Sequence, residues 1–121
     1  MAYKKILIID DDARNIFALS AVLKTKGYTC LSATGAVEGL RFLNSNDVGI
    51  ILLDMMMPEM DGYEVLREMR KSAKAHLPVI AVTAQAMLGD KERCIEAGAD
   101  GYISKPIDVD VLLHVLDNHL H

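Results

Sequence analysis

Side chains that could carry out phosphoryl chemistry follow four short apolar runs of the sequence. They are the acidic run Asp10–Asp12, Asp54, Thr83 and Lys105. Carboxylates held close together repel one another, and a hard divalent cation offsets that repulsion. Mg²⁺ suits such a set because it takes one or two carboxylates and keeps positions for water and phosphate oxygens. Since a lysine and a threonine hydroxyl can bond phosphoryl oxygens, one aspartate of the set could act as a nucleophile and form an aspartyl phosphate.

The apolar runs that precede these side chains predict β-strands. Runs 6–9, 49–53 and 79–82 are continuous rather than alternating, which is typical of parallel strands buried on both faces. Segments 28–33 and 101–104 are weaker strand candidates. Apolar residues at helical spacing predict helices over 13–26, 35–45, 61–72, 86–97 and 108–120.

Strands and helices alternate five times along the chain. This alternation predicts an α/β fold, a doubly wound parallel sheet with helices on both faces. The least regular helix, over 86–97, rests on Leu88 and Ile95. No linker or repeat divides the chain, so we expect one domain over 1–121 with no output domain of its own. Sites in such folds form at the carboxyl ends of the strands, where the four groups are expected to meet.

Composition excludes several classes of function. The chain has 17 acidic and 13 basic residues and a formal net charge of -4, whereas domains that bind nucleic acid carry a basic face. Its two cysteines, Cys30 and Cys94, make no disulfide framework, and no apolar run is long enough to span a bilayer. We therefore expect a soluble, cytoplasmic domain that binds neither nucleic acid nor membrane.

Four stretches of the sequence resemble the receiver domain of two-component response regulators, in particular the receivers of hybrid histidine kinases. They are Ile6–Asp12 (ILIIDDD), Leu52–Gly62 (LLDMMMPEMDG), Ala81–Gly98 (AVTAQAMLGDKERCIEAG) and Tyr102–Ile107 (YISKPI). The resemblance covers essentially the whole chain and implies a five-stranded, flavodoxin-like sheet of order 2-1-3-4-5. It also implies a phosphorelay switch that takes a phosphoryl group from a phosphohistidine of a histidine kinase or histidine phosphotransfer domain.

The resemblance implies a role for each residue that matches the family's motifs. Asp54 would be the phosphoacceptor, and Asp10 and Asp11 would hold Mg²⁺ together with it, one directly and one largely through water. The backbone carbonyl of Met56 would be a further metal ligand. Lys105 would contact the phosphoryl group through its ammonium.

The resemblance also implies the switch residues. Thr83 would bond the phosphoryl group through its hydroxyl, and Tyr102 would change rotamer with it. The Lys105–Pro106 peptide bond is expected to be cis, and Asp12 is expected to be a loop or helix-cap residue. The surface built from the fourth helix, fifth strand and fifth helix, about residues 86–120, would then change and bind a downstream protein.

We expect a signalling switch and not a turnover enzyme, one that catalyses only its own phosphoryl transfer and a slow autodephosphorylation. Met56 stands two residues after the phosphoacceptor, where family members often carry an acid or amide that orients water. Gln85, two residues after Thr83, could still position water. We predict a phosphoryl half-life on the longer side of the family and a monomer or weak dimer. The partner kinase, the pathway and the output stay open.

Two other functions are compatible with the sequence. Asp10 and Asp12 match the Asp-x-Asp spacing of aspartate-nucleophile phosphatases, although Ala13 and Arg14 follow where such enzymes tend to carry Gly and Thr or Val. A phosphorylation-independent interaction module is the second alternative. The intact set of aspartates, threonine and lysine argues against that module.

Overall fold

A five-stranded parallel sheet of order β2-β1-β3-β4-β5 forms the centre of the molecule. The computed structural model describes residues 5–45, 47–58, 61–72, 76–84 and 89–119. The strands are β1 (Lys5–Ile9), β2 (Cys30–Ala33), β3 (Val48–Asp54), β4 (Val79–Thr83) and β5 (Gly101–Ser104). This order and the parallel pairing confirm the predicted fold class.

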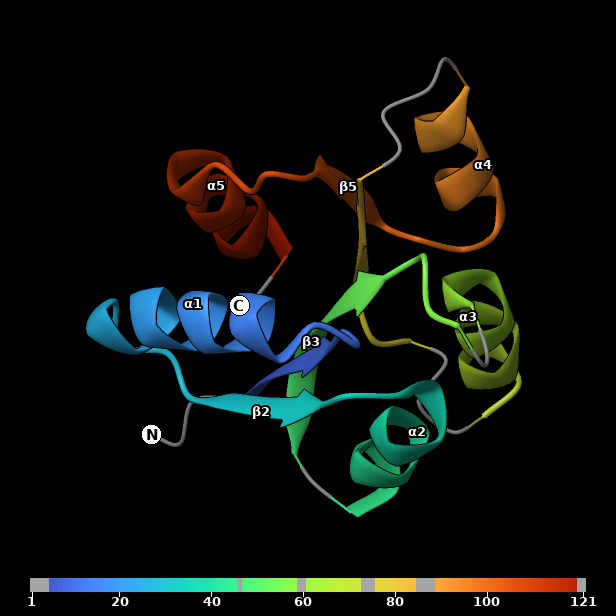
Figure 1. Cartoon of the computed structure of the whole chain (residues 1–121). Helices are drawn as coiled ribbons and strands as arrows, with labels where there is room; N and C mark the ends of the chain where they lie inside the picture. The colour runs from blue at the N-terminus through green and yellow to red at the C-terminus, as the bar shows by residue number, and fades with distance from the viewer. Residues whose placement is uncertain (1–4, 46, 59–60, 73–75, 85–88, 120–121) are drawn as a thin grey trace.

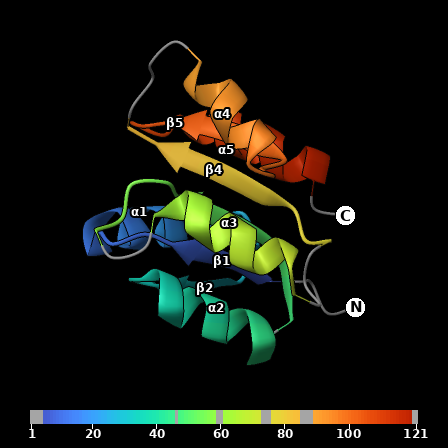
Figure 2. The same cartoon turned by 90° about the vertical axis from the view of Figure 1, so that its right-hand side faces the viewer.

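Helices cover both faces of the sheet (Figure 1). They are α1 (Ala13–Thr25), α2 (Ala36–Ser45), α3 (Gly62–Arg70), α4 (Asp90–Glu96) and α5 (Val109–His119). α1 and α5 lie on one face, and α2, α3 and α4 lie side by side on the other (Figures 1 and 2). No helix within the described part of the chain is long and apolar enough to cross a membrane.

α4 is the helix that departs most from its predicted bounds. It begins at Asp90 rather than at residue 86, and Gly89 directly before it has a φ of 87°. That left-handed conformation is accessible to glycine at little cost and does not belong to a helix interior. Residues 85–88, and with them Leu88 and Gln85, lie outside the described residues, as does Leu120.

Strand β3 is buried along its whole length and packs into two apolar layers. Ile51 and Leu53 belong to the layer beneath α2, α3 and α4. Ile50 and Leu52 belong to the layer beneath α1 and α5. Each such buried side chain contributes about 1.5–3 kcal/mol to folding. The continuous apolar run in the sequence is explained by this two-sided burial.

The strand register brings the expected site residues to one edge of the sheet. Asp10 and Asp54 lie level with each other, because Ile9 before Asp10 pairs with Leu53 before Asp54. Thr83 ends β4, and the register partner of Thr83 in β5 directly precedes Lys105. All five strands run in the same direction, so these residues share the carboxyl edge of the sheet.

Arg70, at the end of α3, joins elements at the opposite edge of the sheet. Its guanidinium donates to the carbonyl of Leu77 over 2.8 Å, to the carbonyl of Gly98, and to Oδ2 of Asp100 over 3.0 Å. The same Asp100 oxygen accepts the N–H of Val79 over 2.8 Å. These contacts tie α3 to the start of β4 and to the turn before β5.

Candidate functional site

Three carboxylates meet at the carboxyl edge of the sheet. Asp10, Asp11 and Asp54 each present an oxygen, and these oxygens all lie within 4.8 Å of one another. Asp10 is 2% exposed and Asp54 is 4% exposed, whereas Asp11 is exposed to solvent. The set offers only hard oxygen donors, which is the chemistry that Mg²⁺ prefers. The three residues predicted as carboxylate ligands are therefore brought together.

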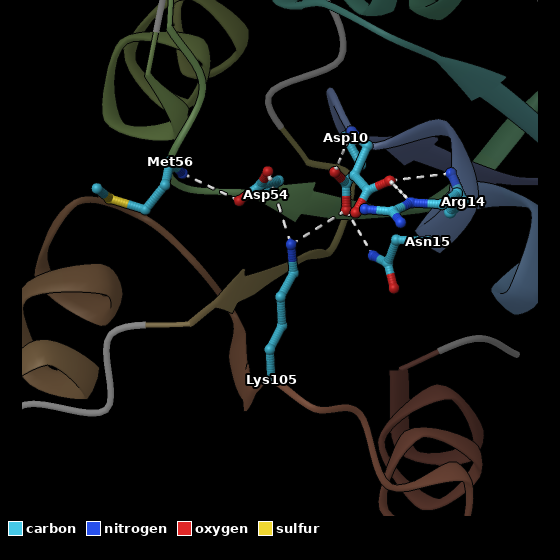
Figure 3. Close-up of polar contacts among 7 residues, drawn as sticks. Asp10, Arg14, Asn15, Asp54, Met56 and Lys105 are labelled. Atoms are coloured by element: carbon cyan, nitrogen blue, oxygen red, sulfur yellow. Dashed lines mark hydrogen bonds and ion pairs between the residues drawn. The ribbon is translucent and has the colours of Figure 1, made fainter.

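The Asp10 carboxylate is held by donors from three different places. Its Oδ1 accepts the backbone N–H of Asp12 over 2.8 Å. Its Oδ2 accepts the side-chain amide of Asn15 over 2.6 Å and the ammonium of Lys105 over 3.4 Å (Figure 3). These bonds offset part of the cost of burying the charge.

Asn15 was not among the residues that the sequence singled out. It is the third residue of α1 after the helix cap, a position from which side chains reach back towards the preceding loop. The preceding loop holds Asp10, so the amide of Asn15 meets that carboxylate. Asn15 could have been found by examining the third residue of the helix that follows an acidic strand end.

Asp12 has a structural task and does not join the acidic cluster. Its Oδ1 accepts the backbone N–H of Arg14 over 2.9 Å and caps the first turn of α1. The guanidinium of Arg14 lies 3.6 Å from the same oxygen. The expected helix-cap role of Asp12 is confirmed. A phosphatase of the Asp-x-Asp type needs both acids at one substrate, and the buried Asp10 beside the partly exposed, helix-capping Asp12 does not suit that function.

The surroundings of the Asp54 side chain raise the pKa of its carboxyl group. Burial raises its pKa to about 6, and the negative charge of Asp10 and the carboxyl of Asp11 act in the same direction. The N–H of Met56, which donates to Oδ1 over 3.0 Å, lowers the pKa. The ammonium of Lys105, 3.8 Å from Oδ2, also lowers it. The net increase means that Lys105 and the N–H of Met56 do not fully offset the burial of the Asp54 carboxylate and the neighbouring acids.

Lys105 lies between the two buried carboxylates. Its backbone N–H donates to the carbonyl of Thr83 over 2.8 Å, which places it at the end of β5. Its ammonium points into the space between Asp10 and Asp54 (Figure 3). The peptide bond to Pro106 is cis, as expected. One ammonium thus contacts two of the three clustered carboxylates, and a cation would complete the neutralisation.

The two expected switch residues lie beside this cluster. Thr83 is 1% exposed and, together with Asp11, lines a cleft of about 620 Å³ that extends towards α4. Tyr102 donates its hydroxyl to Oδ2 of Asp90 over 3.1 Å. Asp90 is the first residue of α4 and is 8% exposed. The contact between Tyr102 and Asp90 links β5 to α4, and the sequence did not suggest it.

Gly62 lets α3 begin directly against the strand that carries Asp54. A Cβ atom at Gly62 would lie 2.5 Å from Sδ and 2.7 Å from Cα of Met55. The N–H of Gly62 donates to the carbonyl of Met55 over 3.2 Å. The loop that contains Met56 is therefore closed by a contact that only glycine allows.

The chain belongs to the response regulator receiver domain family, whose model matches residues 6–117. It is a receiver domain of the kind found in two-component signal transduction. The sequence resemblance to this family is confirmed.

Relatives of two architectures share this domain. Sensor histidine kinase RcsC of Escherichia coli is 40% identical over 111 residues, which are 92% of this chain but only 12% of that kinase. Polar-differentiation response regulator DivK of Brucella abortus is 33% identical over 118 residues, 97% of this chain and 96% of that regulator. The chain therefore resembles both a small part of a large kinase and a nearly whole small regulator.

A solved structure supports the same assignment. The receiver domain of sensor histidine kinase PA1611 from Pseudomonas aeruginosa superposes with a TM-score of 0.88 at 31% identity, covering 98% of each chain. That structure is described with a magnesium ion coordinated in its active-site cleft.

Proposed function

We propose that the chain is a phosphorelay switch in which Asp54 accepts a phosphoryl group from a phosphohistidine. The observation that supports this assignment is the position of Asp54 beside the ammonium of Lys105, which also contacts a second buried carboxylate, Asp10. The donor is a histidine kinase or a histidine phosphotransfer domain, as in the receivers of hybrid kinases. The cytoplasmic location expected from the sequence is part of this proposal.

Asp10, Asp11 and Asp54 would hold Mg²⁺, with the backbone carbonyl of Met56 as a further ligand. Their carboxylate oxygens are close enough for one cation, and one ammonium leaves their charge incompletely neutralised. When bound, the ion neutralises charge on the transferring phosphoryl group. The magnesium described for the related Pseudomonas aeruginosa receiver makes the same cation a reasonable expectation here.

Phosphoryl transfer needs little more from the chain than position and charge. A carboxylate oxygen of Asp54 forms a bond to phosphorus while the bond from phosphorus to the imidazole nitrogen breaks and its electron pair returns to the donor's ring. Lys105 is already within 3.8 Å of Asp54 and can follow the new negative charge. Thr83, at the end of the adjacent strand, can donate its hydroxyl to a phosphoryl oxygen.

The phosphoryl group adds about -1.5 to -2 charges and three acceptor oxygens, and this change can shift a two-state surface. Thr83 and Tyr102 lie on β4 and β5, and Tyr102 contacts α4 through Asp90. The surface built from α4, β5 and α5 is therefore the part of the chain that we expect to bind a downstream protein. We expect a monomer or a weak dimer.

Slow autodephosphorylation is the second part of the proposal. Met56, two residues after Asp54, is 50% exposed and has no polar side-chain atom that could orient an attacking water strongly. The phosphoryl group should therefore persist for minutes or longer after removal of the donor. Loss of the label within seconds from purified, phosphorylated protein would contradict this expectation.

The test of the proposed function is labelling by acetyl phosphate, a small phosphoryl donor that needs no partner protein. We expect the wild-type chain to gain one phosphoryl group by intact mass in the presence of Mg²⁺ and none with EDTA. Asp54→Asn should abolish labelling, whereas Asp117→Asn, the same change at an exposed position of α5, should label as the wild type does. Equal labelling of the Asp54→Asn variant would place the phosphoacceptor elsewhere.

The same variants separate the two alternative functions. A phosphatase would hydrolyse p-nitrophenyl phosphate with an activity that survives Asp54→Asn and is lost on Asp10→Asn. An interaction module would show no labelling under any condition. The interaction module does not account for a lysine placed between two buried carboxylates.

A further inference from the structure

Asn15 makes the tightest contact to the Asp10 carboxylate. Its amide donates to Oδ2 of Asp10 over 2.6 Å, whereas the ammonium of Lys105 lies 3.4 Å from the same oxygen. Figure 3 shows Asn15 and Lys105 approaching Asp10 from different elements. Because Asp10 is only 2% exposed, solvent cannot easily replace a lost donor at this carboxylate.

The two side-chain donors to Asp10 differ in how firmly they are committed to it. Lys105 is shared, since its ammonium also lies 3.8 Å from Oδ2 of Asp54. A phosphoryl group on Asp54 would carry more negative charge than the carboxylate and would draw this ammonium towards itself. Asn15 has no such second partner among the described residues, and the next residue of α1, Ile16, anchors that turn in the apolar core.

We propose that Asn15 is a positioning residue for the cation site. It holds the Asp10 carboxylate in the orientation that Mg²⁺ requires, both before transfer and after Lys105 has moved to the phosphoryl group. Asn15 does not touch the cation or the phosphoryl group and acts only through Asp10. The inference rests on the proposed function, because it assumes that Asp10 binds Mg²⁺.

The expected effect follows from what supporting hydrogen bonds contribute to metal sites. Loss of a hydrogen bond that orients a metal ligand typically costs 10–100-fold in affinity. Asn15 is one of three donors to Asp10, so the lower end of that range applies. We expect Asn15→Ala and Asn15→Leu each to weaken Mg²⁺ binding about tenfold.

Asn15→Leu distinguishes hydrogen bonding from packing. Leucine has the same branched arrangement of side-chain heavy atoms as asparagine and suits a helix, but it cannot donate to Asp10. Asn44→Ala is the matched control, because it makes the same truncation as Asn15→Ala at an exposed position of α2. Urea unfolding of each variant with EDTA verifies that it is folded before Mg²⁺ is added.

The experiment measures Mg²⁺ binding by the shifts of backbone amide resonances in ¹H–¹⁵N spectra during a MgCl₂ titration. The dissociation constant should rise about tenfold for Asn15→Ala and Asn15→Leu and stay unchanged for Asn44→Ala. A second measurement follows the rate of labelling by acetyl phosphate as Mg²⁺ increases. The half-saturating Mg²⁺ concentration should rise about tenfold while the rate at saturation changes less than about twofold.

The outcomes separate this inference from the proposed function. Wild-type affinity in Asn15→Leu would overturn the inference and leave the proposed function intact, because packing alone would then suffice. A fall in the saturated labelling rate with an unchanged half-saturating concentration would also overturn it. A wild-type chain that shows no Mg²⁺-dependent shifts and no labelling would overturn the proposed function, and the inference with it.

Discussion

Replacing Asp54 by asparagine should make the Mg²⁺-free protein more stable near neutral pH. Burial is the main reason that the Asp54 carboxyl has a pKa of about 6 in the fold, compared with an ordinary value of 3.8. A carboxyl group whose pKa is raised by folding destabilises the folded state at every pH at which it is ionised in both states. The penalty is fully present above about pH 6 and disappears as the pH falls through 6 towards 4.

The size of the effect follows from the shift in pKa. A shift from 3.8 to about 6 corresponds to at most about 3 kcal/mol at neutral pH, since each unit represents about 1.4 kcal/mol. The cluster opens to solvent beside the exposed Asp11, and solvent screening reduces this figure. Asparagine can still accept the N–H of Met56. We therefore expect Asp54→Asn to raise the free energy of unfolding by about 1–2 kcal/mol.

The assay is urea unfolding followed by circular dichroism, with EDTA, near pH 7.5 and again near pH 4.5. The gain of Asp54→Asn over the wild type should be clear near pH 7.5 and should shrink by about half or more near pH 4.5. Asp117→Asn, at an exposed position, should change the stability by no more than about 0.5 kcal/mol. A wild type that is as stable as Asp54→Asn near pH 7.5, or a gain that persists near pH 4.5, would refute the reasoning.

Three further changes test other contacts of the fold. Gly62→Ala should lower the free energy of unfolding in urea by about 1–3 kcal/mol, more than Gly101→Ala does. The new Cβ at position 62 would meet backbone, whereas the one at position 101 would meet the tip of a side chain. Equal losses of stability would contradict this account. Tyr102→Phe should cost about 1–2 kcal/mol in the same assay, since it removes a donor from the buried Asp90, and an unchanged stability would show that the contact contributes nothing. Cys94 is fully buried, and burial also raises the pKa of its thiol. In a Cys30→Ser background, which removes the partly exposed thiol, Cys94 should react with a disulfide reagent near pH 8 only as fast as the protein opens, and immediate reaction of the folded variant would be the opposing result.

Most of the architecture could be predicted because its physical cause is local in the sequence. A strand buried on both faces must be apolar at every position, and the run that became β3 shows this without interruption. Once parallel strands alternate with helices, the residue after each strand must lie at the same edge of the sheet. Asp10, Asp54, Thr83 and Lys105 could therefore be placed together before any coordinates were considered.

Contacts made from helices could not be predicted in the same way. The contact of Asn15 with Asp10 lies in the first turn of α1, beyond the strand end, and was not predicted although the predicted helix begins at residue 13, as α1 does. Asp90, which contacts Tyr102, is the first residue of α4, and α4 begins after the left-handed Gly89, four residues later than apolar spacing suggested. Helix boundaries are the least certain feature of a sequence-based prediction, and the side chains that surround a site depend on them.

The costly burial of the Asp54 carboxylate connects the stability and the proposed function of the acidic cluster. Asp54 with a pKa near 6 indicates that Lys105 and the N–H of Met56 do not fully stabilise its carboxylate. A sequence selected for stability alone would remove one acid, and Asp54→Asn would be sufficient. Retaining the Asp54 carboxylate leaves a site that is stabilised when a cation binds. It also leaves a lysine that can move to a new negative charge, while Asn15 keeps the Asp10 carboxylate paired. Increased stability and lost labelling in Asp54→Asn would then both follow from removal of the same buried carboxylate.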